Sequence, residues 1–369
     1  MRGQVDLSDG IPSLIAEGSW VSGGASEPFG SSCLARFRRQ YELIPAYAAY
    51  CRYLGRTPDS VADWRDVPPV PASAFKTHDM SAAPRRAEAA IFETSGTSVS
   101  KPGRVRLGST AAYEASLLKC FERHMLPDGA RLPAIVFGPR RMEAPRSSLW
   151  FMVEKAVQAF APAAVYVVRG GEPRWGEADS VLQRAETRGE PVLLLGTTLF
   201  FMAYFEHLER DGKSLSLPRG SRAMDTGGAK GMRAEFEREE IETAFARHLG
   251  IAPSHLVNEY GMAELGSQFY DDNFLAHHEG RPRLGGKAIP PWVWTRVLDP
   301  ETLAEKPDGE HGLLVHYDLA NVDIPIAVQT EDIGYRVGDR LHLEGRLLGA
   351  EARGCSLPFE KFLAAGGEA

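Results

Sequence analysis

The sequence has few of the features that assign a protein directly to a function class. It holds only four cysteines and no Cys-x-x-Cys pair, which argues against both a zinc site and a disulfide framework. Positive charge is not in excess either, because the formal net charge is −7, so the basic stripe of a nucleic-acid binder is not expected. We therefore expect no nucleic-acid partner.

An export signal and a long apolar segment are also lacking. The first nine residues, Met1 to Asp9, contain no apolar signal core. The longest apolar run, from Pro191 to Phe205, is interrupted by Gly196 and two threonines and is too short to span a membrane. These absences predict a cytoplasmic protein without a membrane span.

A polar loop follows the apolar pair Ile91-Phe92, and it matches neither a Walker loop nor a dinucleotide-binding fingerprint. No Gly-x-Ser-x-Gly elbow of a serine hydrolase occurs anywhere in the chain. The loop places small hydroxyl residues around Gly96, with Lys101 shortly after them. Glycine permits close backbone approach, and hydroxyl and N–H groups donate hydrogen bonds to phosphate oxygens. The segment predicts a phosphate-binding loop, with an ordinary polar turn as the alternative.

Further glycine-rich and acidic segments follow this loop in the chain. They are a turn at 225–231, an Asn-Glu-Tyr-Gly-Met-Ala-Glu segment at 258–264, and a Thr-Glu-Asp segment at 330–332. Together and in this order, they resemble the adenylate-forming superfamily of acyl-CoA synthetases, peptide-synthetase adenylation domains and luciferases. The joint match spans about 240 residues and is specific, although each segment alone is not.

Two more segments are similar to one branch of that superfamily, the LuxE-like acyl-protein synthetases. They are Pro69–Lys76 and Glu351–Leu357, and the resemblance covers roughly residues 30–360. The branch includes the fatty acid ligase of bacterial bioluminescence and adenylases of phenazine-antibiotic pathways. The resemblance implies ATP-dependent adenylation of a small carboxylic acid, for which we expect an aromatic, phenazine-type acid of antibiotic biosynthesis. The acyl group would pass to a reductase, an acyltransferase or another acyl-accepting protein.

Three alternatives to this predicted function stay open. The first is a fatty acyl-protein synthetase that uses Cys355 as its acyl acceptor, with Arg353 nearby to favour the thiolate. Cys355 would otherwise be a small buried apolar residue. The second alternative is an acyl-CoA ligase, and the third is a non-catalytic scaffold that has kept the fold.

The resemblance implies a role for each matching residue. Five loop residues would hold the ATP phosphates: Thr94, Ser95, Gly96, Thr97 and Ser98. Lys101 would lie at the mouth of this loop as a catalytic cation. Four residues would line the acyl substrate: Gly228, Ala229, Tyr260 and Gly261. ATP would also contact Gly227, Gly228, Glu259 and Tyr260.

The acidic positions complete the implied site. Glu264 would bind Mg²⁺, which bridges phosphate oxygens and usually takes only one or two carboxylates from a protein. Asp332 would accept hydrogen bonds from the ribose hydroxyls, and Arg346 would reach the ribose or a phosphate. No general base is required, because a carboxylate substrate is already ionised near neutral pH.

The sequence also departs from the family pattern. Val99 replaces a glycine of the loop, and Lys101-Pro102-Gly103 replaces the usual Pro-Lys-Gly. Glu331 stands where the family has a glycine. Only 37 residues follow Asp332 in the 369-residue sequence, too few for the mobile C-terminal domain that carries a catalytic lysine in the superfamily. Lys76, Lys101 or a partner protein would then supply that charge.

Apolar runs alternate with helical patterns over most of the chain and predict an α/β fold with mostly parallel sheets covered by helices. Expected helices are 35–54, 110–124, 147–160, the segment up to 209, and 234–249; expected strands are 134–137, 164–168, 192–195 and one starting at 256. From about residue 285, short alternating runs predict a small antiparallel β unit at 292–298, 312–317, 324–328 and 340–343. We expect three parts, at 1–165, 166–284 and 285–369, with the mobile C-terminal domain absent or truncated.

Three other polar or aromatic groups invite a functional reading but are better explained structurally. The run His277-His278-Glu279 and the pair Asp271-Asp272 are expected to lie in polar loops rather than to bind a metal. Tyrosines at helical spacing are expected in the core: Tyr41, Tyr47, Tyr50 and Tyr53.

Overall fold

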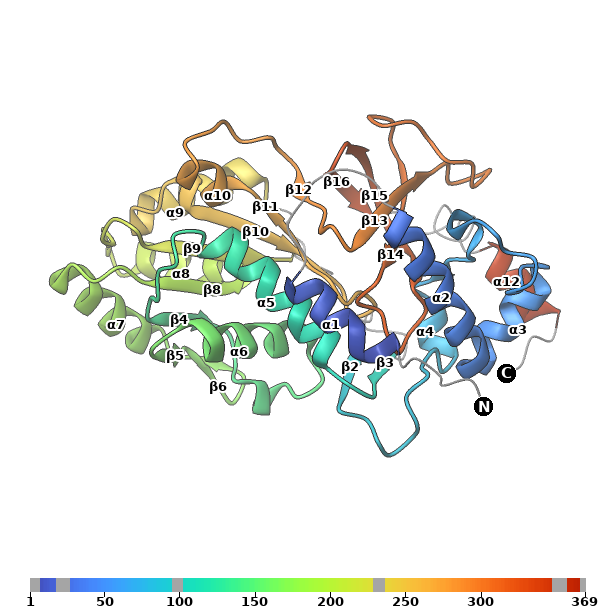
Figure 1. The fold of residues 1–369 in the computed structure, drawn as a ribbon. Coiled ribbons are helices and arrows are strands. Elements are labelled where there is room, and N and C mark those ends of the chain that lie inside the picture. The colour runs from blue at the N-terminus through green and yellow to red at the C-terminus, as the bar shows by residue number, and fades with distance from the viewer. Residues whose placement is uncertain (1–6, 18–26, 95–101, 228–235, 347–356, 366–369) are drawn as a thin grey trace. The chain divides into compact units, whose positions relative to one another are not determined.

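The computed structural model of the chain describes residues 7–17, 27–94, 102–227, 236–346 and 357–365 (Figure 1). The chain folds into two compact units, and neither is one continuous segment. The first unit comprises residues 1–116, 262–268 and 286–369, and the second comprises 117–261 and 269–285. The three-part division expected from the sequence stays a prediction.

The second unit is built on a mostly parallel sheet, as the alternation of strands and helices predicts. The strand order is β11-β10-β9-β8-β4-β5, in which β11 alone runs antiparallel. The strands are β4 (Ala134–Phe137), β5 (Ala164–Tyr166), β8 (Leu193–Thr197), β9 (Arg222–Thr226), β10 (Leu256–Tyr260) and β11 (Phe269–Asp271). Strands β4 and β8 are apolar nearly throughout, as expected for strands that are buried on both faces.

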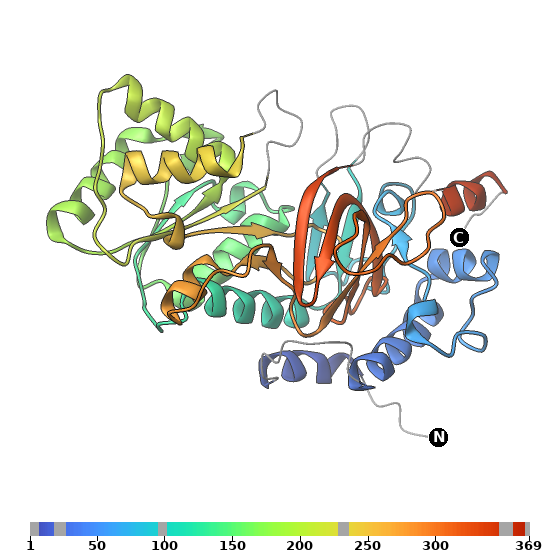
Figure 2. The ribbon, with the colours of Figure 1, turned by 90° about the horizontal axis from the view of Figure 1, so that it is seen from above.

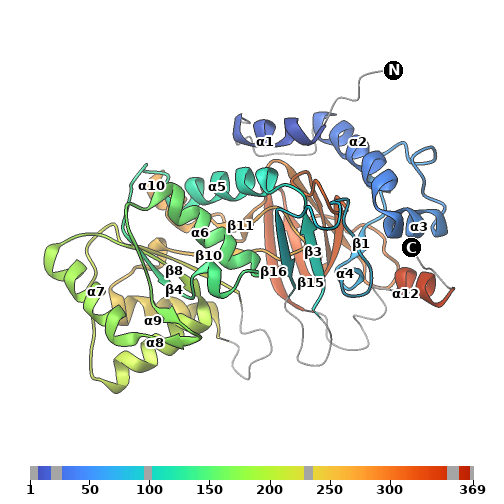
Figure 3. The ribbon, with the colours of Figure 1, turned by 90° about the horizontal axis from the view of Figure 1, so that it is seen from below.

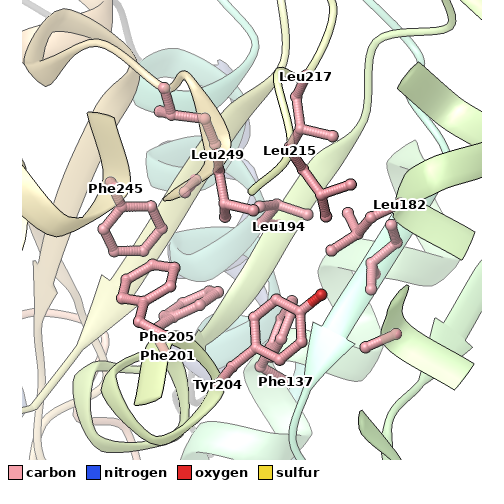
Figure 4. Close-up of a cluster of buried hydrophobic side chains, with 14 of the residues drawn as sticks. Phe137, Leu182, Leu194, Phe201, Tyr204, Phe205, Leu215, Leu217, Phe245 and Leu249 are labelled. Atoms are coloured by element: carbon pink, nitrogen blue, oxygen red, sulfur yellow. The ribbon is translucent and has the colours of Figure 1, made fainter. Parts of the chain in front are cut away.

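Helices cover both faces of this sheet (Figure 3). The end of α5 and all of α6 lie on one face, and α8 and α9 lie on the other. The helices are α5 (Ala111–Met125), α6 (Ser148–Phe160), α7 (Trp175–Arg188), α8 (Thr198–Arg210), α9 (Arg238–Leu249) and α10 (Asn273–His278). A buried apolar cluster joins α7, α8 and α9 to the sheet and includes Phe137, Leu194, Phe201 and Phe245 (Figure 4). Smaller elements are the hairpin β6 (Val168–Arg169) and β7 (Glu172–Pro173), and the short helices η2 (Arg141–Glu143) and η3 (Pro253–His255).

The first unit contains the predicted antiparallel β unit (Figure 2). Its strands follow the order β13-β14-β15-β16-β12, and β1 joins β15 in parallel. They are β1 (Val70–Pro71), β12 (Lys287–Ala288), β13 (Val293–Leu298), β14 (Gly312–Asp318), β15 (Ala327–Val337) and β16 (Arg340–Arg346). A separate hairpin pairs β2 (Ala90–Glu93) with β3 (Arg104–Leu107).

Helices of the first unit come from both ends of the chain. They are α1 (Leu7–Glu17), α2 (Glu27–Leu43), α3 (Pro45–Tyr53), α4 (Ala74–Thr77) and α12 (Leu357–Ala364), with the short helix η1 at Trp64–Asp66. The C-terminal α12 packs on α3, where the ring of Tyr50 lies 5.1 Å from that of Phe359 and 5.6 Å from that of Phe362 (Figure 3). Phe359 also contacts His78, next to the end of α4, at 5.5 Å.

Most of the predicted elements are confirmed, and the exceptions have physical reasons. The single helix expected at 35–54 is wrong, because the chain breaks at Ile44, which is extended (φ −113°, ψ 95°) ahead of Pro45. A residue before proline avoids the helical region, and proline suits the first helical position. Strand β15 begins at Ala327 rather than at residue 324, and helix α7 was not predicted.

The expectations for the remaining groups divide in a similar way. Tyr47 and Tyr50 are core residues, whereas Tyr53 is 45% exposed. His277 and His278 lie in the last turn of α10, and Asp271 ends strand β11, so neither group is wholly loop. Of the described helices, none combines the length and the apolar character needed to cross a membrane.

Candidate functional site

In the second unit, polar side chains gather where the parallel strands β9 and β10 end. Thr226 pairs in register with Glu259, and the Thr226 hydroxyl donates a hydrogen bond to the Glu259 carboxylate. Both residues are buried, at 6% and 4% exposure. Carboxyl ends of parallel strands are the usual ligand-binding edge of an open α/β sheet. The structure thus places Glu259, one of the predicted nucleotide contacts, at that edge.

A buried carboxylate, that of Asp225, directly precedes Thr226 on strand β9. Asp225 is fully buried, and its Oδ2 lies 2.8 Å from the Thr198 hydroxyl and 3.0 Å from the Asn258 amide nitrogen. Its Oδ1 accepts a hydrogen bond from Arg238 at 2.8 Å. Burial alone would lower the pKa of Arg238, but the carboxylates of Asp225 and Asp271 outweigh this and raise it. The guanidinium therefore stays charged, as a buried carboxylate requires.

Gly227 begins the predicted glycine-rich turn at the end of β9. Its φ of +74° lies in the left-handed region that favours glycine, and its carbonyl oxygen is 2.8 Å from the Thr198 hydroxyl. Gly228 and Ala229 lie outside the described residues. Because Asp225 precedes the turn and Arg238 opens the helix after it, their ion pair ties the two ends of this segment together.

Tyr260 and Gly261 follow Glu259 at the same edge. The Tyr260 ring packs against Phe269 of β11, with 5.6 Å between ring centroids. Gly261 is the last residue of 117–261, the first of the two segments that form the second unit. The roles expected for Tyr260 and Gly261 toward adenine and the acyl group stay predictions.

In the first unit, Thr94 closes the base of the predicted phosphate-binding loop. Its N–H donates to the Gly103 carbonyl at 2.9 Å, and its hydroxyl accepts from the Gly103 N–H, also at 2.9 Å. The phosphate-binding role expected for Thr94 stays a prediction. Five predicted loop residues lie outside the described part of the chain: Ser95, Gly96, Thr97, Ser98 and Lys101.

Asp332 and Arg346 face each other across β15 and β16. They are paired in register, and Arg346 Nε lies 3.2 Å from Asp332 Oδ1. Within strand β15, the backbone N–H of Asp332 donates to the Thr330 hydroxyl at 3.0 Å. The two predicted ribose contacts are thus brought together. In the described structure Arg346 holds the carboxylate of Asp332 directly.

Glu264 lies in the segment 262–268 of the first unit and is 4% exposed. A carboxylate offers the hard oxygen ligands that Mg²⁺ prefers, so the residue type fits the predicted ion. The peptide of Glu264 is held by a residue that the sequence did not single out, because Asn321 Nδ2 donates to the Glu264 carbonyl oxygen at 3.1 Å. Asn321 could not be found from the sequence, because a polar residue in a turn between two strands is not part of a periodic pattern.

One other group has the spacing of metal ligands, but it is better satisfied without an ion. Ligand atoms of Asp179, His207 and Asp211 lie within 4.8 Å of one another. The ammonium of Lys213 lies 2.8 Å from Asp179 Oδ2 and 3.0 Å from Asp211 Oδ2. His207 Nδ1 faces Arg210, a donor, so its Nε2 carries the proton and donates to Asp179. The lysine and this tautomer occupy the positions that a metal would need.

The mixed α/β fold, with its large sheet and its helices, is similar to that of adenylate-forming enzyme domains. Two structures of 2-hydroxyisobutyryl-CoA ligase, one open with 2-HIB-AMP and CoA and one in the thioesterification state, are similar to this chain at a TM-score of 0.60 and 16% identity. The first match covers 85% of this chain and 69% of the ligase, and the second covers 88% and 68%. This similarity establishes the fold.

The family follows from the sequence comparisons. Residues 19–364 match the profile of the family described as acyl-protein synthetase, LuxE, so the chain belongs to that family and is a ligase. The long-chain-fatty-acid–luciferin-component ligase of Vibrio harveyi is 25% identical over 87% of this chain and 84% of its own length. Its counterpart from Aliivibrio fischeri is 24% identical over 55% of this chain and 51% of its own length.

Proposed function

We propose that this ligase uses ATP to adenylate a carboxylic acid and passes the acyl group to an acceptor. The observation that carries the proposal is the presence of polar clusters at the predicted nucleotide-binding positions of both units. These clusters are Thr226 with Glu259 in the second unit and Asp332 with Arg346 in the first. The family and the fold support the same chemistry.

The reaction requires positioning and charge stabilisation rather than acid–base catalysis. A carboxylate oxygen of the substrate attacks the α-phosphorus of ATP, the bond to the bridging oxygen breaks, and pyrophosphate leaves. Asp332 would bind the ribose hydroxyls, and Glu264 would hold Mg²⁺. When bound, Mg²⁺ neutralises charge on the phosphates.

For the acid, the two similar ligases of Vibrio harveyi and Aliivibrio fischeri, which are named for long-chain fatty acids, favour a fatty acid over the aromatic, phenazine-type acid expected from the sequence. The aromatic acid has no support among the proteins compared. We therefore propose a fatty acid as the first substrate to test and keep an aromatic acid as the second.

The burial of three cysteines indicates which thiol could accept the acyl group. Cys33, Cys51 and Cys120 are all buried. Burial raises the pKa of Cys33 and that of Cys51 to about 12, so these thiols are protonated and poor nucleophiles at neutral pH. Cys355 lies outside the described residues and is the remaining thiol of the chain. We propose that its thiolate attacks the acyl carbon of the adenylate and that AMP leaves, giving a thioester.

Pyrophosphate exchange into ATP tests the adenylation step, with fatty acids of graded length and fused aromatic acids as substrates. Exchange with one acid class supports the proposal and identifies the class, whereas no exchange with any acid favours a non-catalytic scaffold. Mass spectrometry of the protein after turnover tests the acceptor. An unmodified Cys355 together with a fully active Cys355→Ala variant would contradict the thioester, and a CoA-dependent product would indicate an acyl-CoA ligase.

A further inference from the structure

The turn that joins β14 to β15, residues 319–326, contacts several of the first unit's candidate segments. Asn321 bonds the segment that contains Glu264. Asp323 accepts hydrogen bonds from the N–H groups of Gly108 at 2.8 Å and Ser109 at 3.2 Å, just after strand β3. The turn itself leads into β15, which carries Asp332. It therefore links the Glu264 segment, the β2–β3 hairpin and the Asp332 strand.

The side-chain amide of Asn321 makes a two-sided bond to the backbone on either side of Leu265. Its Oδ1 accepts from the Gly266 N–H at 2.7 Å, and its Nδ2 donates to the Glu264 carbonyl at 3.1 Å. A third bond runs from Nδ2 to the Pro325 carbonyl at 3.2 Å within the turn. An amide is needed here, because one group must accept while the other donates twice. Asn321 is 1% exposed, so no solvent competes for these bonds.

The segment that contains Glu264 is closely packed against the turn 319–326. A Cβ atom on Gly266 would lie 2.8 Å from the carbonyl carbon and from the Cβ of Ala320, closer than van der Waals contact allows. Ser267 adds a further bond, since its hydroxyl donates to Asp318 Oδ1 at 2.8 Å. The backbone of 264–267 is thus fixed on the start of the turn by side-chain bonds and by shape.

Gln40 of α2 holds the turn from its other side. Its Nε2 donates to the Asn321 carbonyl at 2.8 Å, and its Oε1 accepts from the Ile326 N–H at 2.8 Å. Gln40 is also 1% exposed. A buried network that is satisfied at both ends keeps a single geometry, because any rearrangement leaves a buried polar group unpaired.

We propose that Asn321 is a positioning residue that fixes the peptide of Glu264 and so aims its carboxylate for Mg²⁺. This inference rests on the proposed function and deepens it. Residues that orient a metal ligand typically change metal affinity about 10- to 100-fold when mutated. We expect the Asn321→Ala variant to need about tenfold more Mg²⁺ for half-maximal pyrophosphate exchange.

The matched control is Asn273→Ala in the second unit. Asn273 is also a buried asparagine, at 7% exposure, and its Nδ2 also donates to a backbone carbonyl, that of Leu256 at 2.8 Å. It therefore reproduces the loss of a buried amide without touching the Glu264 segment. A Glu264→Gln variant, alone and combined with Asn321→Ala, shows whether Asn321 acts through the carboxylate.

Two measurements test whether Asn321 positions Glu264, and the first does not depend on enzymatic activity. Hydrogen exchange at the Gly266 amide should accelerate at least about tenfold in Asn321→Ala and stay unchanged in Asn273→Ala, because a hydrogen bond to that amide is lost. The Mg²⁺ requirement should rise in Asn321→Ala alone and should not rise further in the Glu264→Gln background.

An unchanged Gly266 exchange rate in Asn321→Ala overturns the inference. The inference is also overturned if the wild-type enzyme is active and the Asn321→Ala variant needs no more Mg²⁺ than the Asn273→Ala variant. In that case the proposed function still stands. A wild-type protein that exchanges pyrophosphate with no acid refutes the proposed function, and this inference falls with it.

Discussion

Replacing Arg238 by methionine tests how the buried carboxylate of Asp225 is stabilised at the proposed nucleotide-binding edge of the second unit. The side chain of Asp225 is 0% exposed and that of Arg238 is 33% exposed, with 2.8 Å between Arg238 Nη1 and Asp225 Oδ1. In Arg238→Met, the donors that remain to the buried carboxylate among the described residues are the neutral groups of Thr198 and Asn258. Breaking a buried pair by removing one partner costs about 3–5 kcal/mol, and we expect a loss of unfolding free energy in that range.

Urea unfolding followed by tryptophan fluorescence and circular dichroism measures this loss. The control is Arg169→Met, which removes an ion pair of similar length in the same unit: Arg169 and Glu177 lie 2.7 Å apart but are 50% and 35% exposed. An exposed pair contributes about 0–1 kcal/mol, so the control should stay near wild type. The double variant Asp225→Asn with Arg238→Met should recover part of the stability, because no buried charge remains.

The reasoning is refuted if Arg238→Met loses no more stability than Arg169→Met. A double variant that is less stable than Arg238→Met alone would also refute it, since the unpaired charge could then not be the cause. Either result would mean that the carboxylate of Asp225 is stabilised by other contacts.

Three further predictions follow from the first unit. Glu264→Gln should reduce pyrophosphate exchange by at least about 100-fold in the Mg²⁺-dependent reaction, and wild-type exchange would contradict its assignment. Asp332→Asn should raise the KM for ATP about tenfold with a smaller change in kcat, since a hydrogen bond to a charged group contributes about 1.5–3 kcal/mol; steady-state kinetics at varied ATP measure this. Burial lowers the pKa of His316 from its ordinary 6.5 to about 3, so the unfolded chain binds a proton that the folded chain does not. Stability should therefore fall as the pH drops below 6.5, by about 2–3 kcal/mol more in wild type than in His316→Gln between pH 6.5 and 4.5. Equal losses in both proteins would show that this histidine is not buried in its neutral form.

The strands of the second unit could be predicted because their signal is local. Runs such as 134–137 and 193–195 are apolar throughout and are flanked by helical patterns, which is typical of a parallel sheet covered on both faces. The candidate residues Glu259 and Asp332 were found through the order of motifs, not through any periodicity. The break at Ile44 was missed although Pro45 marks it, because the tyrosine spacing across the break imitates one continuous helix.

The supporting residues could not be predicted, because their partners are far away in the chain. Gln40 and Asn321 are 281 positions apart and meet only when the fold is complete. Arg238 and Asp225 flank a glycine-rich turn, but nothing in the sequence indicates which of the nearby acidic residues the arginine would choose. Such residues have ordinary surface chemistry, and only burial gives them their role.

The packing of α12 on α3 joins two segments that lie far apart in the sequence. Phe359, which is 2% exposed, lies against Tyr50 and His78. Because the rings of Tyr50 and Phe359 cover each other, a smaller side chain at either position would uncover apolar surface at the other. The stability of helix α3, near the start of the chain, therefore depends on a helix formed from its last described residues.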